Sequence, residues 1–490
     1  MTPSIEGVEV LQAEGRIVMT ITIPLDFSAN TPIQHLDNEK QIREATRQLG
    51  LEATKAVYQK VADRSIAMQS YQNEEGYSMR QDKVSGVDYV CAYGSFESRR
   101  PNFVNDYTKA GEVPFEIETR MDEHRMTPMF QFICLQKCVQ SGPLKVAELL
   151  EEDLRIHVSH HLLDQFLGTM GERYHSVRPD ALRATVEEDW APTWLPPVVR
   201  AGEEASTPKD VQNDNSGKNA EKINVVQYDP MTVTIRKYEG DQDKGTRGRE
   251  YHTERHQLHN VVTGCLSLDG PRKAGERIEL KNRRYFSEYE SPEELLLLVR
   301  ENLESSGMQP GDKLLLQADG AEKLWERMET VFTGYEFVEA LDERHCQKNL
   351  REAADLAYPD EDKKNRDWVQ ARMDELYTGR YEHFFNALNY LVRRANDPDT
   401  KKQLKTKRTY FRKNQHRIRY YDLLKEGYII STCFVESGHR HVIGERLRGN
   451  GRSYVEERLI NIADLRCEYK SNQLPKVFEN YLMERHHEAA

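Results

Sequence analysis

The hydrophobic pattern of the first part of the chain predicts a mixture of strands and helices. Residues 8–23 alternate between apolar and polar in the way of a β-strand, and residues 38–61 form a polar stretch with helical spacing. Between residues 143 and 174 the apolar residues fall on the faces of two helices, and Ser159 can cap the second one. Helix, short turn and helix is the outline of a helix-turn-helix, and any other α-hairpin would give the same pattern.

The second half of the chain follows the order of a mixed α/β sheet. β-branched runs predict three strands joined by hairpins, and Pro230 separates the first two of them; the runs are 223–229, 231–238 and 256–268. After these come a leucine-rich helix, a buried strand, an amphipathic helix and a short strand, at 291–305, 313–319, 321–331 and 335–342. The pattern is helical from about 345 to 426, and two further helices begin near 436 and 455.

Strand, strand, strand, helix, strand, helix, strand and then helices is the order of elements in a ribonuclease-H-like fold. Residues 201–222 are polar and rich in Gly, Ser, Asn and Asp, which is typical of a linker. We therefore predict an α/β protein in which a ribonuclease-H-like domain with a helical insertion follows a mixed α+β N-terminal region. The predicted segments are an α+β region at 1–140, a helix-turn-helix DNA-binding region at 141–190, a linker at 191–222, the ribonuclease-H-like domain at 223–343 and 428–490, and the helical insertion at 344–427.

Three carboxylates stand at the ends of predicted elements. Asp229 ends the first β-branched run, Asp319 ends the buried strand, and Glu436 opens a charged helix. In the ribonuclease-H-like order the first and fourth strands are neighbours, so the two aspartates can meet, and a helix that crosses the sheet can bring the glutamate to them. Oxygen ligands from three elements can hold two Mg²⁺ or Mn²⁺ ions about 3.5–4 Å apart, which is a site for phosphoryl transfer. We therefore predict that these three acids are catalytic residues and metal ligands.

Each of these acids also has a local structural explanation. Asp229 precedes a proline and could form a turn, Asp319 begins an Asp-Gly turn, and Glu436 could stabilise the first turn of a helix. Asp342 and His345 form an Asp-x-x-His pair after the last predicted strand. This accessory pair could orient a phosphate near the metals, or it could make a helix-start contact at i,i+3 spacing.

The charge of the chain differs from that of one of its segments. The net charge is −12, which argues mildly against a nucleic-acid partner, yet residues 401–420 hold nine Lys or Arg and no Asp or Glu, with three aromatic residues between them. Such a stretch is either a solvated helix face or a phosphate-binding surface, and the lack of acids favours phosphate contact. Glycines and arginines after Glu436 give a further segment with room and charge for a DNA backbone. The predicted DNA-binding residues are Lys401, Lys402, Lys405, Lys407, Arg408, Arg412, Lys413, Arg417, Arg419, Arg440, Arg446, Arg448 and Arg452.

The cysteines and the first residues of the chain predict its compartment. The seven cysteines contain no CxxC pair and no dense framework, which is typical of free thiols in a reducing compartment. The N-terminal residues lack the basic and apolar regions of a signal peptide, and no apolar run approaches the roughly 18 residues of a membrane span. We therefore expect a cytoplasmic protein with no membrane partner.

The motifs around the acids resemble those of one family. They are LLLQADGA at 314–321 with Trp325 after it, LDERH at 341–345, VES at 435–437 with HVI at 441–443, and the basic stretch RLRGNGRSY at 446–454. These residues are similar to the DDE transposases of Kra-type insertion sequences, which are distant relatives of Mutator-like elements. The resemblance is strongest from about 280 to 480, weaker around Asp229, and extends in outline to 143–174.

The resemblance implies a ribonuclease-H-like catalytic domain that cuts transposon ends and joins them to target DNA with two Mg²⁺ ions. Carried over by position, the catalytic acids are Asp229, Asp319 and Glu436, with Asp342 and His345 as the accessory pair. It also implies DNA as the partner, a homo-oligomer that brings two ends together, and a location on the bacterial nucleoid. Two features depart from the family. Pro230 follows the first acid where glycine is usual, and the N-terminal CxxC zinc ribbon often seen in the family is absent.

Three functions stay open at the level of the sequence. The first is an active transposase, which cuts and joins DNA at its metal site. The second is a catalytically inactive DNA-binding protein derived from a transposase, which would bind DNA without metal-dependent cleavage. The third is a ribonuclease-H-like nuclease that cuts without joining, and a strand-transfer assay with pre-cut ends separates it from the first.

Overall fold

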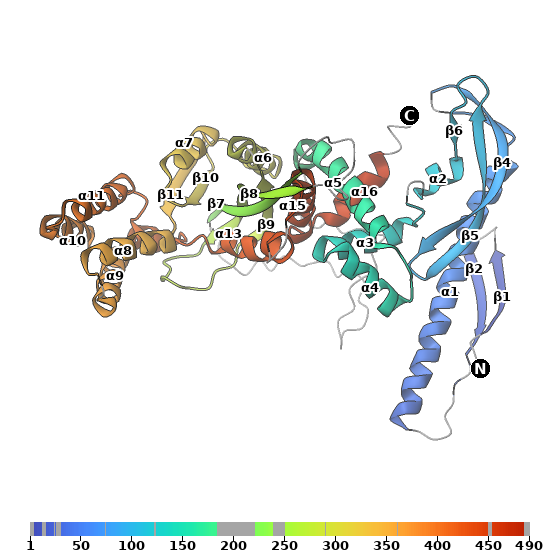
Figure 1. Cartoon of the computed structure of the whole chain (residues 1–490), viewed down its shortest axis with the longest axis horizontal. Helices are drawn as coiled ribbons and strands as arrows, with labels where there is room; N and C mark the ends of the chain where they lie inside the picture. The colour runs from blue at the N-terminus through green and yellow to red at the C-terminus, as the bar shows by residue number, and fades with distance from the viewer. Residues whose placement is uncertain are drawn as a thin grey trace. The chain divides into compact units, whose positions relative to one another are not determined.

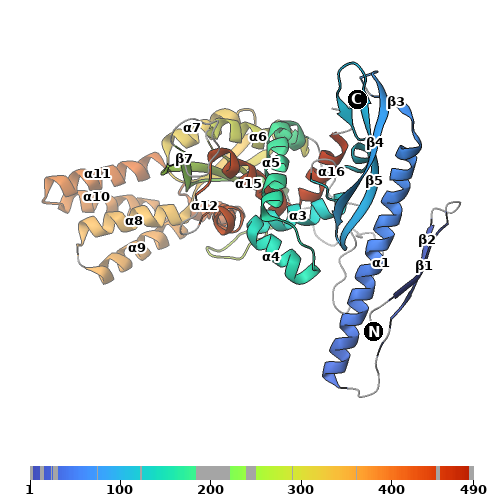
Figure 2. The ribbon, with the colours of Figure 1, turned by 45° about the vertical axis from the view of Figure 1, so that its right-hand side comes forward.

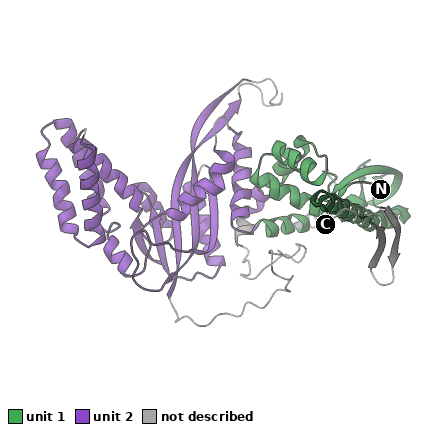
Figure 3. Ribbon diagram, turned by 90° about the horizontal axis from the view of Figure 1, so that it is seen from below, with its two compact units in different colours: residues 1–173, 474–490 green, residues 174–473 purple. Residues whose placement is uncertain are grey.

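The computed structural model describes residues 4–11, 16–23, 25, 31–73, 75–121, 124–183, 221–238, 250–289, 291–359, 361–448 and 453–484. The chain divides into two compact units, which are drawn in different colours in Figure 3. Unit 1 consists of residues 1–173 and 474–490, and unit 2 of residues 174–473. Both units mix helices and strands, which confirms the α/β class. The finer division into five segments stays a prediction, and 191–220 of the predicted linker lies outside the described residues.

Unit 1 begins with a hairpin, a long helix and an antiparallel sheet (Figure 2). The hairpin joins β1 (Ser4–Leu11) to β2 (Arg16–Thr22), and the helix α1 is Pro32–Ala67. The sheet has the order β3 (Ser70–Gln72), β4 (Ser78–Cys91), β5 (Gly94–Asn105), β6 (Gly111–Glu112). Helix α1 starts where the Thr31 hydroxyl accepts the Gln34 N–H and Pro32 takes the first turn. It packs on β5 over a core that includes Tyr89, Phe96 and Phe115.

The rest of unit 1 is helical. Its helices are α2 (Pro114–Thr119), α3 (Pro128–Gln140), α4 (Pro143–Leu154), the first part of α5 (His160–Arg183), and α16 (Leu474–Glu484). Helices α4 and α5 are the two helices expected between 143 and 174, and the Ser159 hydroxyl accepts the Leu162 N–H at 3.2 Å. The apolar side of α5 is buried as the spacing predicts, through Leu163, Phe166, Leu167 and Met170. Arg155, in the left-handed region with φ 57°, ends α4 and turns the chain toward α5.

Unit 2 is built on a five-stranded mixed sheet (Figure 1). Its elements in chain order are β7 (Glu221–Tyr238), β8 (Tyr251–Leu268), β9 (Lys281–Glu288), α6 (Pro292–Ser305), β10 (Lys313–Ala318), α7 (Glu322–Val331) and β11 (Glu336–Leu341). The strand order in the sheet is β11-β10-β7-β8-β9. Strands β7, β8 and β9 are antiparallel neighbours, whereas β10 runs parallel to both β7 and β11.

The first strand corrects one expectation from the sequence. Pro230 was predicted to separate two strands, but β7 continues through it, and Pro230 is paired with His259 of β8. The pairing of β7 with β10 ends at Gln227, so Pro230 lies on a part of β7 whose other side is open. Proline has no backbone N–H, and on such an edge no neighbouring strand requires that donor. The third antiparallel strand is therefore β9, at 281–288, which the hydrophobic pattern did not indicate.

Helices cover both faces of this sheet. Along β10, Leu314, Leu316 and Ala318 face one core with α6 and α7, while Leu315 faces another with the helices that follow β11. Those helices are α8 (Glu343–Ala357), α9 (Asp362–Tyr377), α10 (Tyr381–Arg394), α11 (Pro398–Lys413), α12 (Tyr420–Lys425), α13 (Cys433–Gly438), the π-helix η3 (His439–Gly444), α14 (Glu445–Leu447) and α15 (Glu456–Lys470). In the part of the chain that is described, no helix combines the length and the apolar character that a membrane crossing requires.

Candidate active site

Two of the predicted acids come together where the pairing of β7 with β10 ends, Asp229 in the middle of β7 and Asp319 just after β10. Gln227 of β7 is paired with Gln317 of β10 in a parallel ladder. Asp229 and Asp319 each lie two residues beyond this pair, so they occupy equivalent places on neighbouring strands. Because side chains alternate along a strand, both carboxylates face the same side of the sheet as the two glutamines.

The strand β11 adds a third acid to the same edge. The pairing of β10 with β11 runs to the last residue of each strand, so the next residues, Asp319 and Asp342, are neighbours. The side chain of Asp342 is fully buried and caps α8: one oxygen accepts the His345 N–H at 3.0 Å, and the other accepts the Thr432 N–H at 2.8 Å. The three aspartates therefore form an acid row across β7, β10 and β11.

The electrostatics of Asp229 reflect this row. Its side chain is 17% exposed, and burial raises the pKa of its carboxyl to about 7, with further contributions from the charges of Asp319 and Asp342. Desolvation and like charge both disfavour the ionised form of an acid. A cation placed between the carboxylates would oppose both effects, which is the electrostatic property expected of a divalent metal site.

A pair of buried glutamines fixes the helix that carries the predicted glutamate. The side-chain oxygen of Gln227 accepts two backbone N–H groups at the start of α13, each at 3.1 Å, and its amide donates to Gln317 at 2.8 Å. Both amides also donate to backbone carbonyls just before α13, at 3.0 and 2.9 Å. We call Gln227 and Gln317 the glutamine clamp. The sequence interpretation missed this clamp. Its signal is a repeated pattern of two apolar residues, Gln, any residue and Asp, which occurs as VVQYD at 225–229 and as LLQAD at 315–319.

Glu436 lies on α13, beside rather than in the acid row. Its carboxylate forms an ion pair with Arg344 in the first turn of α8. One helical turn later, the His439 Nε2–H donates to the backbone carbonyl of Asp229 at 2.9 Å, and its Nδ1 lies 3.5 Å from the Asp229 carboxylate. Residues three apart on a helix are neighbours, so Glu436 stands one turn from a residue that contacts Asp229.

His439 was not among the predicted site residues. Burial lowers the pKa of its imidazole, which favours the neutral form. It begins the π-helix η3, and single π-turns are frequent at functional sites. The signal that could have identified it is the Glu-x-x-His spacing from Glu436 to His439, which places both side chains on one face of a helix.

A small cavity opens beside Asp319. It has a volume of about 370 Å³, and its walls include Asp319, His345, Lys348 and Tyr410. The ring of Tyr410, from α11, lies directly against Gly320, where an added Cβ would come within 2.2 Å of the ring atoms. The Tyr410 hydroxyl and the His345 Nδ1 are both buried without a hydrogen-bond partner. The glycine of the Asp-Gly pair therefore makes room for an aromatic residue of the helical segment.

The local explanations for the acids also have support in the geometry. The Asp319 carboxylate accepts the Ala321 N–H at 2.9 Å, as an Asp-Gly turn requires. His345 and Asp342 make the predicted helix-start contact, through the backbone N–H of His345, while the His345 ring nitrogen is 3.9 Å from the carboxylate. These contacts position the side chains; both oxygens of Asp342 are occupied by backbone N–H groups, whereas the contact of Asp319 uses one of its two oxygens.

The predicted DNA-binding residues of 401–420 fall into two groups. Among the described residues, Lys401, Lys402 and Lys405 form no ion pair. The other six are held by the protein itself. Lys407 contacts Glu352 and Asn349, Arg408 contacts Asn389, and Arg412 lies over the ring of Phe385. Lys413 pairs with Glu322, Arg417 pairs with both Glu329 and Glu339, and Arg419 pairs with Asp422. Arg417 is 10% exposed and lies over the ring of Trp325 at 4.1 Å, so its guanidinium serves packing.

The arginines after Glu436 also differ from one another. Arg440 and Arg448 are exposed. Arg446 is buried and donates to the Tyr454 hydroxyl. Arg452 lies outside the described residues.

The metal ligands suggested by the sequence do not form a complete cage. Within the described ranges, no group of three or more His, Cys, Asp or Glu side chains is arranged to hold a metal ion. Asp229 and Asp319 fit Mg²⁺ by the chemistry of their oxygens, and Mg²⁺ is ordinarily held by one or two carboxylates together with water and substrate phosphates. The acid row is therefore compatible with Mg²⁺.

Comparison with known proteins gives one match. A family model described as an uncharacterised protein family, UPF0236, matches residues 250–477, a little under half of the chain. The matched part contains Asp319, Asp342, His345 and Glu436, whereas Asp229 lies before it. No curated protein matches the chain.

Proposed function

We propose that unit 2 is a ribonuclease-H-like catalytic domain and that the chain is a DNA transposase of the Kra-type, Mutator-related kind. The strand order supports this proposal: three antiparallel strands in sequence, followed by two parallel strands added beside the first, is the ribonuclease-H-like arrangement. The helices α8 to α12 would form the insertion between the second and third acids. Helices α4 and α5 of unit 1 would form the helix-turn-helix.

The observation that carries the proposal is the pairing of Gln227 with Gln317. This register leaves Asp229 and Asp319 on neighbouring parallel strands, each two residues past the last pair, and the same two glutamines hold the helix that bears Glu436. In the proposed site, Glu436 would join these two acids from α13. Ligands and substrates of α/β sheets commonly bind just beyond the carboxyl ends of the strands.

The chain's own residues have separate tasks in the proposed reaction. Asp229 and Asp319 would bind Mg²⁺, with Glu436 as the third acid once its carboxylate is released from Arg344. When bound, Mg²⁺ would activate the attacking oxygen and stabilise the leaving oxygen. His345 and Tyr410 line the cavity beside Asp319, and each carries a buried polar atom that has no hydrogen-bond partner among the described residues. These atoms would orient a DNA phosphate for attack.

Cations outside the acid row would bind DNA phosphates that lie at a distance from the phosphate that reacts. Lys401, Lys402 and Lys405 would contribute from α11, and Arg440 and Arg448 from the segment after Glu436. Each cation that neutralises a phosphate makes binding more dependent on salt, because counterions are released. In unit 1, the exposed side of α5 carries His160, His161 and Gln165, which would contact DNA without adding fixed charge.

The test is Mg²⁺-dependent cleavage of duplexes that carry the DNA flanking the gene, where terminal inverted repeats are expected. Asp319→Asn should lower cleavage at least 100-fold and leave duplex binding intact. Asp312→Asn, at the opposite end of the same strand, is the matched control and should cleave like the wild type. Equal cleavage by Asp319→Asn and the wild type would refute the proposal. Joining of pre-cut ends to target DNA then separates a transposase from a nuclease that only cuts.

A second candidate function is DNA binding without chemistry. The ion pair between Glu436 and Arg344 favours it, because that contact occupies the third acid. This candidate predicts salt-dependent DNA binding that Mg²⁺ does not change, and no cleavage by either the wild type or Arg344→Ala. Detectable metal-dependent strand cleavage by the wild type excludes it.

A further inference from the structure

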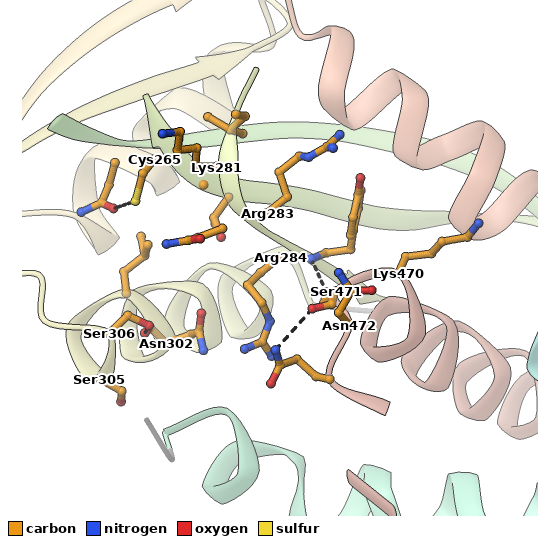
Figure 4. Close-up of a pocket in the computed structure, with 18 of the residues that line it drawn as sticks. Cys265, Lys281, Arg283, Arg284, Asn302, Ser305, Ser306, Lys470, Ser471 and Asn472 are labelled. Atoms are coloured by element: carbon orange, nitrogen blue, oxygen red, sulfur yellow. Dashed lines mark hydrogen bonds between the residues drawn. The ribbon is translucent and has the colours of Figure 1, made fainter. Parts of the chain in front are cut away.

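A second cavity of unit 2 lies away from the acid row (Figure 4). Its volume is about 970 Å³. Asn224 of β7 is part of its wall, five residues before Asp229, which is a separation of about 16–17 Å along an extended strand. Strands β8 and β9 and the ends of α6 and α15 complete the walls. The cavity is therefore distinct from the site of the proposed cleavage reaction.

The lining of this cavity is polar. Pockets for drug-like molecules are lined mainly by apolar and aromatic side chains. Here the hydroxyl and amide groups predominate, and they come from β8 and from the ends of α6 and α15: Thr263, Asn302, Ser305, Ser306, Ser471 and Asn472. A lining of this kind suits a ligand that is charged or rich in hydrogen-bond acceptors.

Basic side chains give the cavity its charge. Lys281, Arg283, Arg284 and Lys470 line it, against one carboxylate, Glu279. Arg284 is paired with Glu468 at 3.3 Å, whereas Lys281 and Arg283 are exposed and, among the described residues, form no ion pair. The Arg283 guanidinium also lies over the ring of Phe434 at 5.9 Å, so Lys281 is the more available of these two cations. The charge favours an anionic ligand.

An irregularity in the sheet gathers these cations. The pairing of β8 with β9 shifts between Thr263 and Cys265, so Asn282 and Arg283 oppose the single residue Gly264. An added Cβ on Gly264 would lie 2.6 Å from Leu280, and Asn282 adopts a left-handed conformation with φ 50°. This is a β-bulge, a feature that re-aims side chains and is frequent near functional sites. The bulge lies on the edge strand β9, so basic side chains on both sides of this strand can line the cavity (Figure 4).

Arg284 supplies a second and independent observation. Its side chain is 16% exposed, and its Nε is buried without a hydrogen-bond partner. Buried donors are ordinarily paired. This Nε has no exposed surface as the side chain stands, so a ligand oxygen in the cavity could satisfy it only after the guanidinium turns; guanidinium groups are well suited to phosphate oxygens.

The geometry points to a binding site for the phosphates of a nucleotide. The ligand is either a free nucleotide or one unit of a DNA strand, because both present the same phosphate oxygens beside a polar sugar. Lys281 and Arg283 pair with the charged phosphate oxygens, Arg284 adds positive charge to the wall, and the hydroxyl and amide side chains contact the sugar. This site goes beyond the proposed transposase function and does not depend on it, since binding here requires neither the acid row nor a metal.

The experiment compares two fluorescent probes on the full chain without metal: a mant-labelled dATP and a ten-nucleotide thymidine strand. The double variant Lys281→Ala/Arg283→Ala should weaken binding of the probe that occupies the cavity at least tenfold. For the strand, the slope of log Kd against log salt should fall by about 1.4, because each phosphate contact on a single strand contributes about 0.7. The probe that responds identifies the source of the phosphate.

Two further variants keep the test decisive. Lys363→Ala/Arg366→Ala removes two exposed cations of α9 that form no ion pair among the described residues, and it should change neither affinity. Lys281→Arg/Arg283→Lys keeps the charge and should retain most of the binding, which a general loss of folding would not allow. If the wild type binds neither probe, or if the double variant and the α9 control bind both probes equally, the site does not exist. Asp319→Asn changes the proposed cleavage site and leaves this cavity intact, so this variant should bind the probes like the wild type. A wrong transposase proposal would therefore leave this binding unchanged.

Discussion

Asp229→Asn should change the pH dependence of stability in a way that can be worked out from the acid row. The carboxyl of Asp229 has a pKa of about 7 in the folded protein and about 3.8 when unfolded. The folded state therefore holds this proton more tightly, so the stability linked to it is complete below pH 3.8 and is lost as the pH rises to 7. The total is about 4 kcal/mol, at about 1.4 kcal/mol per pKa unit. Between pH 5 and pH 8, the wild type should lose about 3 kcal/mol relative to the variant, whose amide cannot ionise.

Urea unfolding of the full chain in the presence of a chelator measures this difference. Trp325 and Trp368 lie in unit 2, and Trp325 donates its indole N–H to the backbone carbonyl of Asp319 at 2.6 Å, so fluorescence reports on the relevant unit. Asp269→Asn is the control, because Asp269 is exposed and outside the row. If the free energies of unfolding of Asp229→Asn and the wild type run parallel from pH 5 to pH 8, the carboxylates are not packed as described. The interpretation of the acid row would then be wrong.

Three other changes test separate parts of unit 2. Gly320→Ala should lower stability by about 1–3 kcal/mol through overpacking against the ring of Tyr410, and Tyr410→Ala in the same chain should restore much of the loss in a thermal melt. Arg417→Met should cost about 3 kcal/mol in urea unfolding, because a buried glutamate loses its partner; a change below 0.5 kcal/mol would contradict that role. Lys402→Ala/Lys405→Ala should leave unfolding unchanged but lower the salt slope of duplex binding by about 1.8, as fluorescence anisotropy can show.

The sequence predicted the elements of unit 2 better than their edges. The elements from 291 to 342 follow from hydrophobic period, and the buried strand at 313–319 corresponds to β10, whereas two of the three strands predicted before them are halves of β7. Pro230 misled the interpretation because a proline interrupts a strand only where its N–H is needed, and that depends on where β10 stops pairing. The strand β9 escaped notice because its exposed end is basic, as Lys281 and Arg283 illustrate.

The candidate site, too, could be predicted from the sequence only in part. Asp229 and Asp319 could be singled out because each ends an apolar run in the sequence, although Asp229 lies within β7, where its pairing with β10 has ended. The contacts of Glu436 could not be foreseen, because an ion pair with Arg344 depends on how α8 and α13 pack. Nor could composition tell Lys405, which forms no ion pair with any described residue, from Arg417, which is buried between glutamates only a few turns away. Local sequence gives the residue types, while tertiary contacts decide which charges remain available.

The glutamine clamp also imposes an order in time on the formation of this site. Gln227 holds the backbone of Phe434, which is 207 residues later in the chain. At a synthesis rate of about 5–20 residues per second, the interval between the two is about 10–40 s. During that interval a growing chain can already pair β7 with β10 and bring Asp229 beside Asp319, but α13 has no residues to dock. A chain still on the ribosome would thus hold the two aspartates together before it contains Glu436.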